Sequence, residues 1–89
     1  MIKIIKATYI AGYTIRLEFS DHYFSEVDFS YLLSKNTALT DPLKDKTYFK
    51  DFFLEMGALC WKNGLELSPS SLYYKAKESG RLHKGEVAA

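Results

Sequence analysis

Cysteine, histidine and proline are scarce in this 89-residue sequence, which has one, two and two of them, and long hydrophobic runs are missing. A single cysteine, Cys60, excludes an internal disulfide framework and fits a reducing compartment. The first residues are interrupted by Lys3 and Lys6 and show no cleavage pattern, so they favour a strand over a signal peptide. We therefore expect a cytoplasmic protein with no membrane segment.

An excess of charge of one sign is also lacking, because 12 Lys and Arg oppose 11 Asp and Glu. Nucleic-acid-binding proteins usually concentrate basic residues on one face. The one local excess includes Glu78 and is more typical of a solvated segment. Its basic members are Lys75, Lys77, Arg81 and Lys84. The charge pattern therefore argues against a nucleic-acid partner.

Residue types at the spacing of a reactive site are missing as well. Cys60 lies in an apolar stretch, where a small buried thiol is the ordinary interpretation, and His22 and His83 are both distant in sequence. One cysteine and two separated histidines lack zinc-ligand spacing, and the glycines form no phosphate-binding loop. Ser70 follows Pro69, which is typical of a helix start. The sequence therefore predicts no catalytic, cofactor-binding or metal-binding residue, no cofactor and no enzyme activity.

Apolar side chains are abundant instead, with 47% hydrophobic and 16% aromatic residues. A chain of this size forms one small domain and buries roughly 60–65% of the surface that it exposes when unfolded. Seven Tyr, six Phe and one Trp can be accommodated inside only in part. The composition is therefore compatible with an aromatic surface for a partner.

Apolar and polar residues alternate through the first third of the chain, which is typical of strands with one wet face. The three apolar rows are Ile5, Ala7 and Tyr9; Tyr13, Ile15, Leu17 and Phe19; and Tyr23, Val27 and Phe29. The pattern predicts an antiparallel meander with one apolar face.

The length of the loop between the second and third strands decides whether their apolar rows coincide, because residues directly opposite in an antiparallel pair share a face. A two-residue loop would separate the rows, whereas a three-residue loop over residues 20–22 pairs Ile15 with Val27. We therefore predict the longer loop. Its last residue, His22, is expected at positive φ.

The first hairpin is expected to follow the same rule. A three-residue loop over residues 10–12 places Ala7 opposite Ile15 and Ile5 opposite Leu17. This register keeps all three rows on one side of the sheet.

Helical signals follow the meander. Residues 31–33 suggest a short helical turn, and Asp41 before a proline resembles the N-cap of another. Asp45 or Thr47 could cap a further short helix that runs to Phe52. Aromatic residues at helical spacing in this segment predict packing against the apolar face of the sheet.

Short strands return in the second half of the chain. A glycine separates the apolar stretches 52–54 and 58–61, and an Asn-Gly pair follows. A hairpin loop over residues 62–64 would pair Trp61 with Leu65.

The last predicted element is a short helix that starts within residues 68–71 and carries Leu72 and Tyr73. From Ser79 onward, Gly, charged and small residues predominate, so we expect one domain over residues 1–78 and a mobile tail over 79–89. The predicted class is α+β: a three-stranded antiparallel β-meander, short helices packed on one face and a C-terminal β-hairpin.

The order of these segments resembles the bacterial DUF2442 family of small domains of unknown function, over about residues 3–74. The segments that carry the resemblance are 20–22, 27–32, Pro42-Leu43, Tyr48-Phe49 and 57–64, and its most specific residues are Trp61, Asn63, Gly64, Pro69, Leu72 and Tyr73. The resemblance implies a small α+β fold. Family members are often encoded beside another small protein, which implies a toxin–antitoxin-like pair.

The sequence departs from the family pattern at several positions. His22 stands where the family usually has glycine, Lys62 where it tends to have proline, and Glu66 and Ser70 where it tends to have aspartate. The missing acidic group at Ser70 weakens any catalytic or metal-binding role for that segment.

Two hypotheses follow. The first is a non-catalytic interaction module that binds a protein partner or a second copy of itself, as a homodimer for example, through exposed aromatic side chains or an uncovered strand edge. For Trp61 and Tyr73, both packing behind the hairpin and anchoring a partner stay open. The alternative is a nucleic-acid-associated regulatory protein with a basic patch around Tyr73 or Tyr74, made of Arg16, Lys75, Lys77, Arg81 and Lys84.

Overall fold

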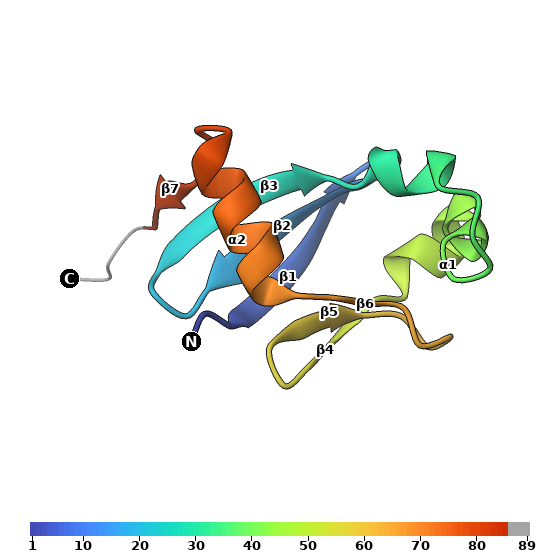
Figure 1. Cartoon of the computed structure of the whole chain (residues 1–89), viewed down its shortest axis with the longest axis horizontal. Helices are drawn as coiled ribbons and strands as arrows, with labels where there is room; N and C mark the ends of the chain where they lie inside the picture. Colours follow the sequence, from blue (N-terminus) through green and yellow to red (C-terminus); the bar gives the residue numbers. More distant parts are fainter. Residues whose placement is uncertain (86–89) are drawn as a thin grey trace.

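Two small antiparallel sheets and one ten-residue helix dominate the fold (Figure 1). The computed structural model describes residues 1–85. The larger sheet has the order β1-β2-β3-β7, with β1 Ile4–Ala11, β2 Thr14–Phe19, β3 Tyr23–Asp28 and β7 His83–Lys84. The smaller sheet has the order β4-β5-β6, with β4 Phe53–Glu55, β5 Ala58–Cys60 and β6 Glu66–Leu67. The α+β class and the N-terminal meander are confirmed.

Short helices connect the strands. The 3₁₀ helices η1 Ser30–Ser34 and η2 Asp41–Lys44 and the α-helix α1 Lys46–Lys50 lie between β3 and β4, and α2 Pro69–Glu78 follows β6. Figure 1 shows α2 crossing in front of the larger sheet, with α1 and the 3₁₀ helices at the other end of the molecule.

The register of β2 and β3 agrees with the sequence prediction. Ile15 lies opposite Val27 and Leu17 opposite Ser25. His22, the last residue of the loop, has a φ of 71°. The three-residue loop therefore keeps the apolar rows of both strands on the core side.

The predicted register of β1 and β2 is wrong by two residues. Ala7 lies opposite Leu17, not Ile15, because a two-residue turn at residues 12–13 joins the strands and a register shift between residues 9 and 11 takes up the extra residue. A shift of two residues preserves the side-chain alternation, so Ala7 still packs against the core.

A second register shift, near the start of β1, moves Ile5 out of the predicted core row. Ile4 is 2% exposed and Ile5 is 58% exposed. The shift lies between Ile4 and Lys6, and the backbone N–H of Ile4 donates to Gly57 O of the second sheet at 2.9 Å. The contact between the two sheets therefore forms at Ile4, the residue that is buried in place of Ile5.

The core lies between the two sheets and their helices. Its largest fully buried side chains are Trp61, Phe19, Phe29, Phe49, Ile15, Leu17, Leu43 and Leu59. Residues from every part of the chain up to α2 contribute to one cluster. The fold is thus a single small core, as the length of the chain requires.

The caps of the short helices differ partly from the prediction. Asp45 caps α1 by accepting a hydrogen bond from Thr47 N at 3.0 Å. The N-cap of η2 is Thr40, so Asp41 is its first residue and not its cap, and α1 ends at Lys50 before it reaches Phe52.

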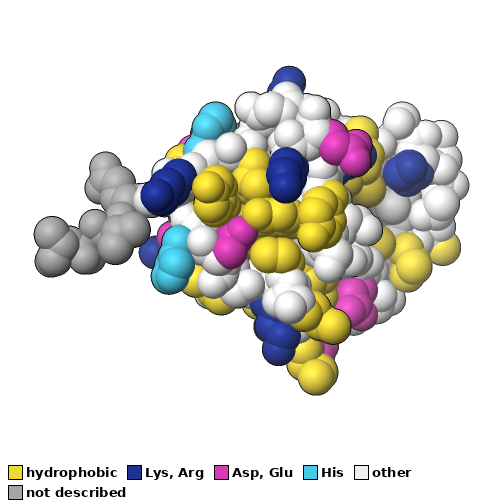
Figure 2. Space-filling model, turned by 60° about the vertical axis from the view of Figure 1, so that its left-hand side comes forward, with side chains coloured by type: hydrophobic (Ala, Val, Ile, Leu, Met, Phe, Trp, Pro, Cys, Tyr) yellow, Lys and Arg dark blue, Asp and Glu magenta, His cyan; other side chains and the backbone are white. Residues whose placement is uncertain are grey.

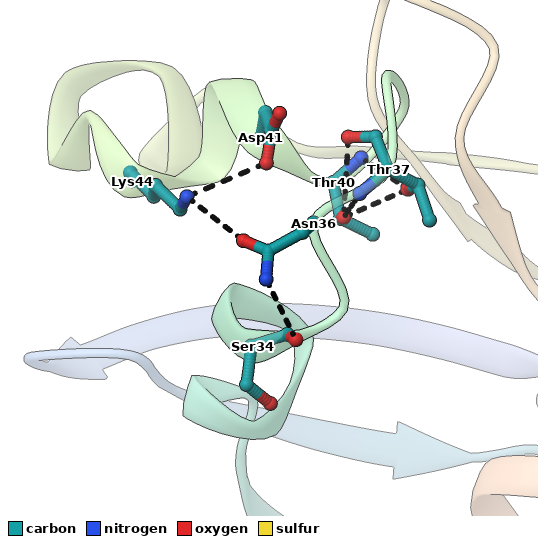
Figure 3. Close-up of polar contacts among 6 residues, drawn as sticks. All are labelled: Ser34, Asn36, Thr37, Thr40, Asp41 and Lys44. Carbon is teal, nitrogen blue, oxygen red and sulfur yellow. Dashed lines mark hydrogen bonds and ion pairs between the residues drawn. The ribbon is translucent and has the colours of Figure 1, made fainter.

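Side chains close the loop between η1 and η2 (Figure 3). Lys44 Nζ lies 3.2 Å from Asn36 Oδ1 and 3.4 Å from Asp41 Oδ1. The hydroxyls of Thr37 and Thr40 are 2.8 Å apart, and Thr40 is buried. Because these groups bond to one another, the cluster stabilises the loop.

The C-terminal hairpin has the predicted register. Leu59 lies opposite Leu67, and Trp61 N donates to Leu65 O at 2.9 Å. Ser68 then caps α2 by accepting a hydrogen bond from Ser71 N.

The chain after α2 differs from the expected mobile tail. β7 pairs with β3 at Tyr23 and Phe24, Leu82 packs against the core, and Gly85 N donates to His22 O at 2.8 Å. A two-residue strand has no periodicity, so the sequence gives no signal for it. Residues 86–89 of the predicted tail lie outside the described residues.

Candidate functional site

Trp61 is a core residue. Its side chain is 1% exposed, and its indole N–H donates to Phe49 O at 2.9 Å. The ring lies 5.9 Å from that of Phe49 and 6.4 Å from that of Phe52. The structure therefore places Trp61 behind the hairpin and away from any partner that binds at the surface.

The other predicted residues of the hairpin and of the helix start stabilise the fold. Asn63 accepts a hydrogen bond from Leu65 N at 3.2 Å and donates to Leu39 O at 3.1 Å. Gly64, at a φ of 97°, completes the turn. Pro69 occupies the first turn of α2, and Leu72 is buried.

Tyr73 is the one aromatic residue of the predicted set that is partly exposed. It is half-buried, and its ring packs edge-on against Phe19 at 5.1 Å. Its hydroxyl donates to Asp21 Oδ2 at 2.5 Å, which connects α2 to the loop between β2 and β3. Because 52 residues separate Asp21 from Tyr73, sequence spacing could not indicate this pair.

Two further tyrosines surround Tyr73. The ring of Tyr74 lies 5.2 Å away and is 53% exposed, and Tyr23 is close enough to affect the pKa of Tyr73. We call Tyr23, Tyr73 and Tyr74 the tyrosine face. Figure 2 views the molecule from the side of β7 and α2, where hydrophobic side chains form one patch with basic and acidic side chains within it and around it.

Asp21 makes the hydroxyl of Tyr73 less acidic. The hydrogen bond to Asp21 raises the pKa of Tyr73 to about 12, because it stabilises the protonated phenol. Above the unfolded-state pKa of about 10, the unfolded chain loses this proton before the folded one does. The contribution of Tyr73 to stability is therefore complete below pH 10 and is lost as the pH rises through 12.

We expect the difference in unfolding free energy between the wild type and Tyr73→Phe to be constant from neutral pH to pH 10 and to fall above it. Urea titrations at a series of pH values measure this difference. Absorbance at 295 nm should also show one fewer tyrosine ionising near pH 12 in Tyr73→Phe. A difference that rises with alkaline pH would contradict the assignment.

Cys60 has the environment of an unreactive thiol. Burial raises its pKa, and the carboxylates of Glu66 and Glu55 raise it further. The hollow beside it, about 180 Å³, is lined by both carboxylates but by no histidine. Within residues 1–85 no three His, Cys, Asp or Glu side chains come together as a metal site would require.

Comparison with known proteins identifies the family. The family model described as "Protein of unknown function (DUF2442)" matches residues 4–78. The chain belongs to the DUF2442 family. The match runs from β1 to the last residue of α2, so β7 lies outside the matched DUF2442 region. Comparisons with curated proteins and with solved structures give no match.

His22 adopts a backbone conformation that favours glycine. At a φ of 71°, a residue with a Cβ costs about 1–2 kcal/mol, whereas glycine loses about 0.5–1 kcal/mol more backbone entropy on folding. We expect His22→Gly to stabilise this DUF2442 domain by about 0.5–1 kcal/mol in urea denaturation. His83→Gly, in an extended strand, should destabilise it; stabilisation by both changes would contradict the argument.

Two of the basic residues of the nucleic-acid hypothesis, Arg16 and Lys75, contact aromatic rings other than those of Tyr73 and Tyr74. Arg16 stacks on Phe24 at 3.8 Å and lies 3.7 Å from the Glu26 carboxylate, on the face of the sheet away from the core. Lys75 Nζ lies 4.2 Å from the Tyr31 ring.

In the part of the chain that the structure describes, no helix has the length and apolar character needed to cross a membrane.

Proposed function

We propose that this chain is a non-catalytic module that binds a protein partner through the tyrosine face. The observation that supports it is the grouping of Tyr23, Tyr73 and Tyr74 on one surface beside Asp21. Tyrosine offers a large ring area with a polar tip, and it is enriched in the parts of protein interfaces that contribute most to affinity.

The tyrosine face is also preorganised. Tyr73 is held by the edge contact with Phe19 and by the hydrogen bond to Asp21. A side chain that is already ordered loses little conformational entropy when a partner binds, so more of the contact energy contributes to affinity. Tyr74, packed against Tyr73, remains exposed and can contact the partner directly.

The partner is either a second copy of the chain or a second protein. We favour a small protein encoded beside this one in a bacterial genome, as one half of a toxin–antitoxin-like pair in the cytoplasm. The support for this choice is the resemblance of the sequence to a family whose genes often have such neighbours.

Co-expression with the neighbouring gene product tests the proposal. We expect co-purification with the wild type, and at least a tenfold loss of affinity for Tyr74→Ser, because truncation of a hot-spot aromatic side chain costs about 2 kcal/mol or more and a tenfold loss corresponds to about 1.4 kcal/mol. Phe53→Ser is the matched control, since Phe53 is 42% exposed but lies on β4. Equal affinity of Tyr74→Ser and the wild type, or a strictly monomeric chain with no protein partner, would contradict the proposal.

We also propose that nucleic acid is not the partner. Arg16 is paired with Glu26, and Tyr73 donates its hydroxyl proton to a carboxylate, which repels a phosphate backbone. Mobility-shift assays with single- and double-stranded DNA and RNA should show no binding at about 150 mM salt. A shift that weakens steeply with added salt would favour the nucleic-acid alternative instead.

A further inference from the structure

The edge of the larger sheet is left open beyond β7. Phe29 N donates to Tyr13 O at 2.8 Å, and hydrogen-bonded pairs alternate along an antiparallel ladder. The odd-numbered residues of β3 therefore bond to β2, and the N–H and C=O groups of Glu26 and Asp28 point to the opposite edge. β7 pairs with β3 only at residues 23 and 24. Among residues 1–85, no backbone group bonds to Glu26 or Asp28 on that edge.

A groove runs between this edge and α2. Its volume is about 290 Å³. Val27 of β3 and Leu72 and Ala76 of α2 are its apolar lining residues. The free backbone groups of Glu26 and Asp28 therefore border an apolar groove, next to which a further strand could lie.

The groove has two basic side chains without a bonded acid. Lys75 and Arg81 both line it, and neither takes part in a salt bridge with another described residue. Two carboxylates also line the groove: Asp28, whose Oδ1 accepts a hydrogen bond from Ser30 N at 2.9 Å, and Glu26, which lies 3.7 Å from Arg16. Since no ion pair within residues 1–85 joins Lys75 or Arg81 to either of them, both basic side chains can pair with a carboxylate of a bound segment.

We propose that the groove between β3 and α2 binds an extended, acidic segment of a partner protein by strand addition. The segment pairs with the backbone of Glu26 and Asp28, inserts an apolar side chain over Leu72, and directs a carboxylate to Lys75 and Arg81. This inference rests on the proposed function, because it names the segment that a partner presents. It uses a different face of α2 from the tyrosine face.

An extended peptide fits this groove better than a cofactor or a helix. A volume of about 290 Å³ lies at the lower limit for small-molecule pockets, which span about 300–1,000 Å³. A helix satisfies its own backbone, whereas the edge of β3 offers two N–H and two C=O groups at the spacing of a strand. Binding between a sheet edge and a helix by strand addition is an established mode of peptide recognition.

A phage-displayed library of random twelve-residue peptides, panned against the whole chain, tests the proposal. We expect enriched sequences in which β-branched apolar residues alternate with Asp or Glu. The double variant Lys75→Glu, Arg81→Glu should weaken the best peptide at least tenfold. Lys77→Glu, also on α2 but outside the groove lining, should have a smaller effect, and N-methylation of the central peptide amides should abolish binding.

Amide hydrogen exchange by NMR locates the peptide. We expect exchange at Glu26 and Asp28 to slow on addition of the best peptide, because their N–H groups become bonded. Val27, whose N–H already bonds to β2, serves as the internal control and should change less.

Failure of this inference can be told apart from failure of the proposed function. No enriched peptide, or peptides whose binding ignores the Lys75→Glu, Arg81→Glu variant, would overturn the groove, even where Tyr74→Ser abolishes binding of the natural partner. Peptides that bind the groove and protect Glu26 support it, even where Tyr74→Ser leaves the natural partner bound.

Discussion

Trp61→Ala is expected to lower the free energy of unfolding by about 3–5 kcal/mol, the range found when a buried aromatic side chain is truncated. The change leaves a cavity against the ring of Phe49 and removes the indole donor of Phe49 O, which is then buried without a partner. Because small domains are stable by only about 5–15 kcal/mol, the variant should be partly or wholly unfolded. Urea denaturation followed by circular dichroism measures the loss.

Two variants separate the causes of this loss. Trp61→Phe retains a ring but no N–H donor, so it should cost about 1–3 kcal/mol through the unpaired carbonyl. Phe53→Ala removes an exposed aromatic side chain from the neighbouring strand β4 and should change stability by less than about 1 kcal/mol. A cost below about 1 kcal/mol for Trp61→Ala would show that the indole is not part of the core.

Gly57→Ala is expected to cost about 2–4 kcal/mol, because two penalties add. Gly57 has a φ of 83°, which a residue with a Cβ rarely adopts, and a Cβ built there would lie 2.6 Å from Lys3 Cβ. Relief requires β1 to move away, yet Gly57 O accepts the hydrogen bond from Ile4 N that joins the two sheets. A movement of β1 that relieved the clash with Lys3 would therefore weaken the hydrogen bond between the two sheets.

Gly64→Ala is the matched control for Gly57→Ala. Gly64 has a φ of 97°, but no atom lies within 4 Å of a Cβ built there. Only the backbone penalty applies, so thermal or urea denaturation should show a cost of about 1 kcal/mol. Equal costs at the two positions would mean that the close approach to Lys3 contributes nothing.

Strand alternation and loop length were sufficient to predict the pairing of β2 with β3. A register shifted by one residue would have exposed the whole row that holds Ile15 and Leu17. The hydrophobic pattern therefore excludes shifts of one residue, whereas a shift of two residues keeps the same side chains in the core. The same argument gave the correct side of Ala7 in β1 but the wrong partner, because a slip of two residues preserves the face. Residues of a single hairpin, such as Trp61 and Leu65, were predicted for the same local reason.

The tyrosine face could be predicted only in part. Tyr73 was recognised from the sequence as a packing or partner-binding residue, but its hydrogen bond to Asp21 joins segments 52 residues apart. The groove beside α2 was not predicted, because it depends on where β7 stops along β3. Its basic residues were noted in the sequence, but as a loose cluster of the C-terminal segment.

By itself the sequence determined the α+β class, the family, the strands other than β7 and the faces of most of their side chains, because alternation and turn chemistry act between neighbours in the chain. Only the tertiary structure decided that Ile4 is buried in place of Ile5, that β7 pairs with only the first two residues of β3, and that Asp21 holds Tyr73. These features depend on contacts between distant segments, which form when the sheets and α2 pack together. Such contacts leave no periodic pattern in the sequence.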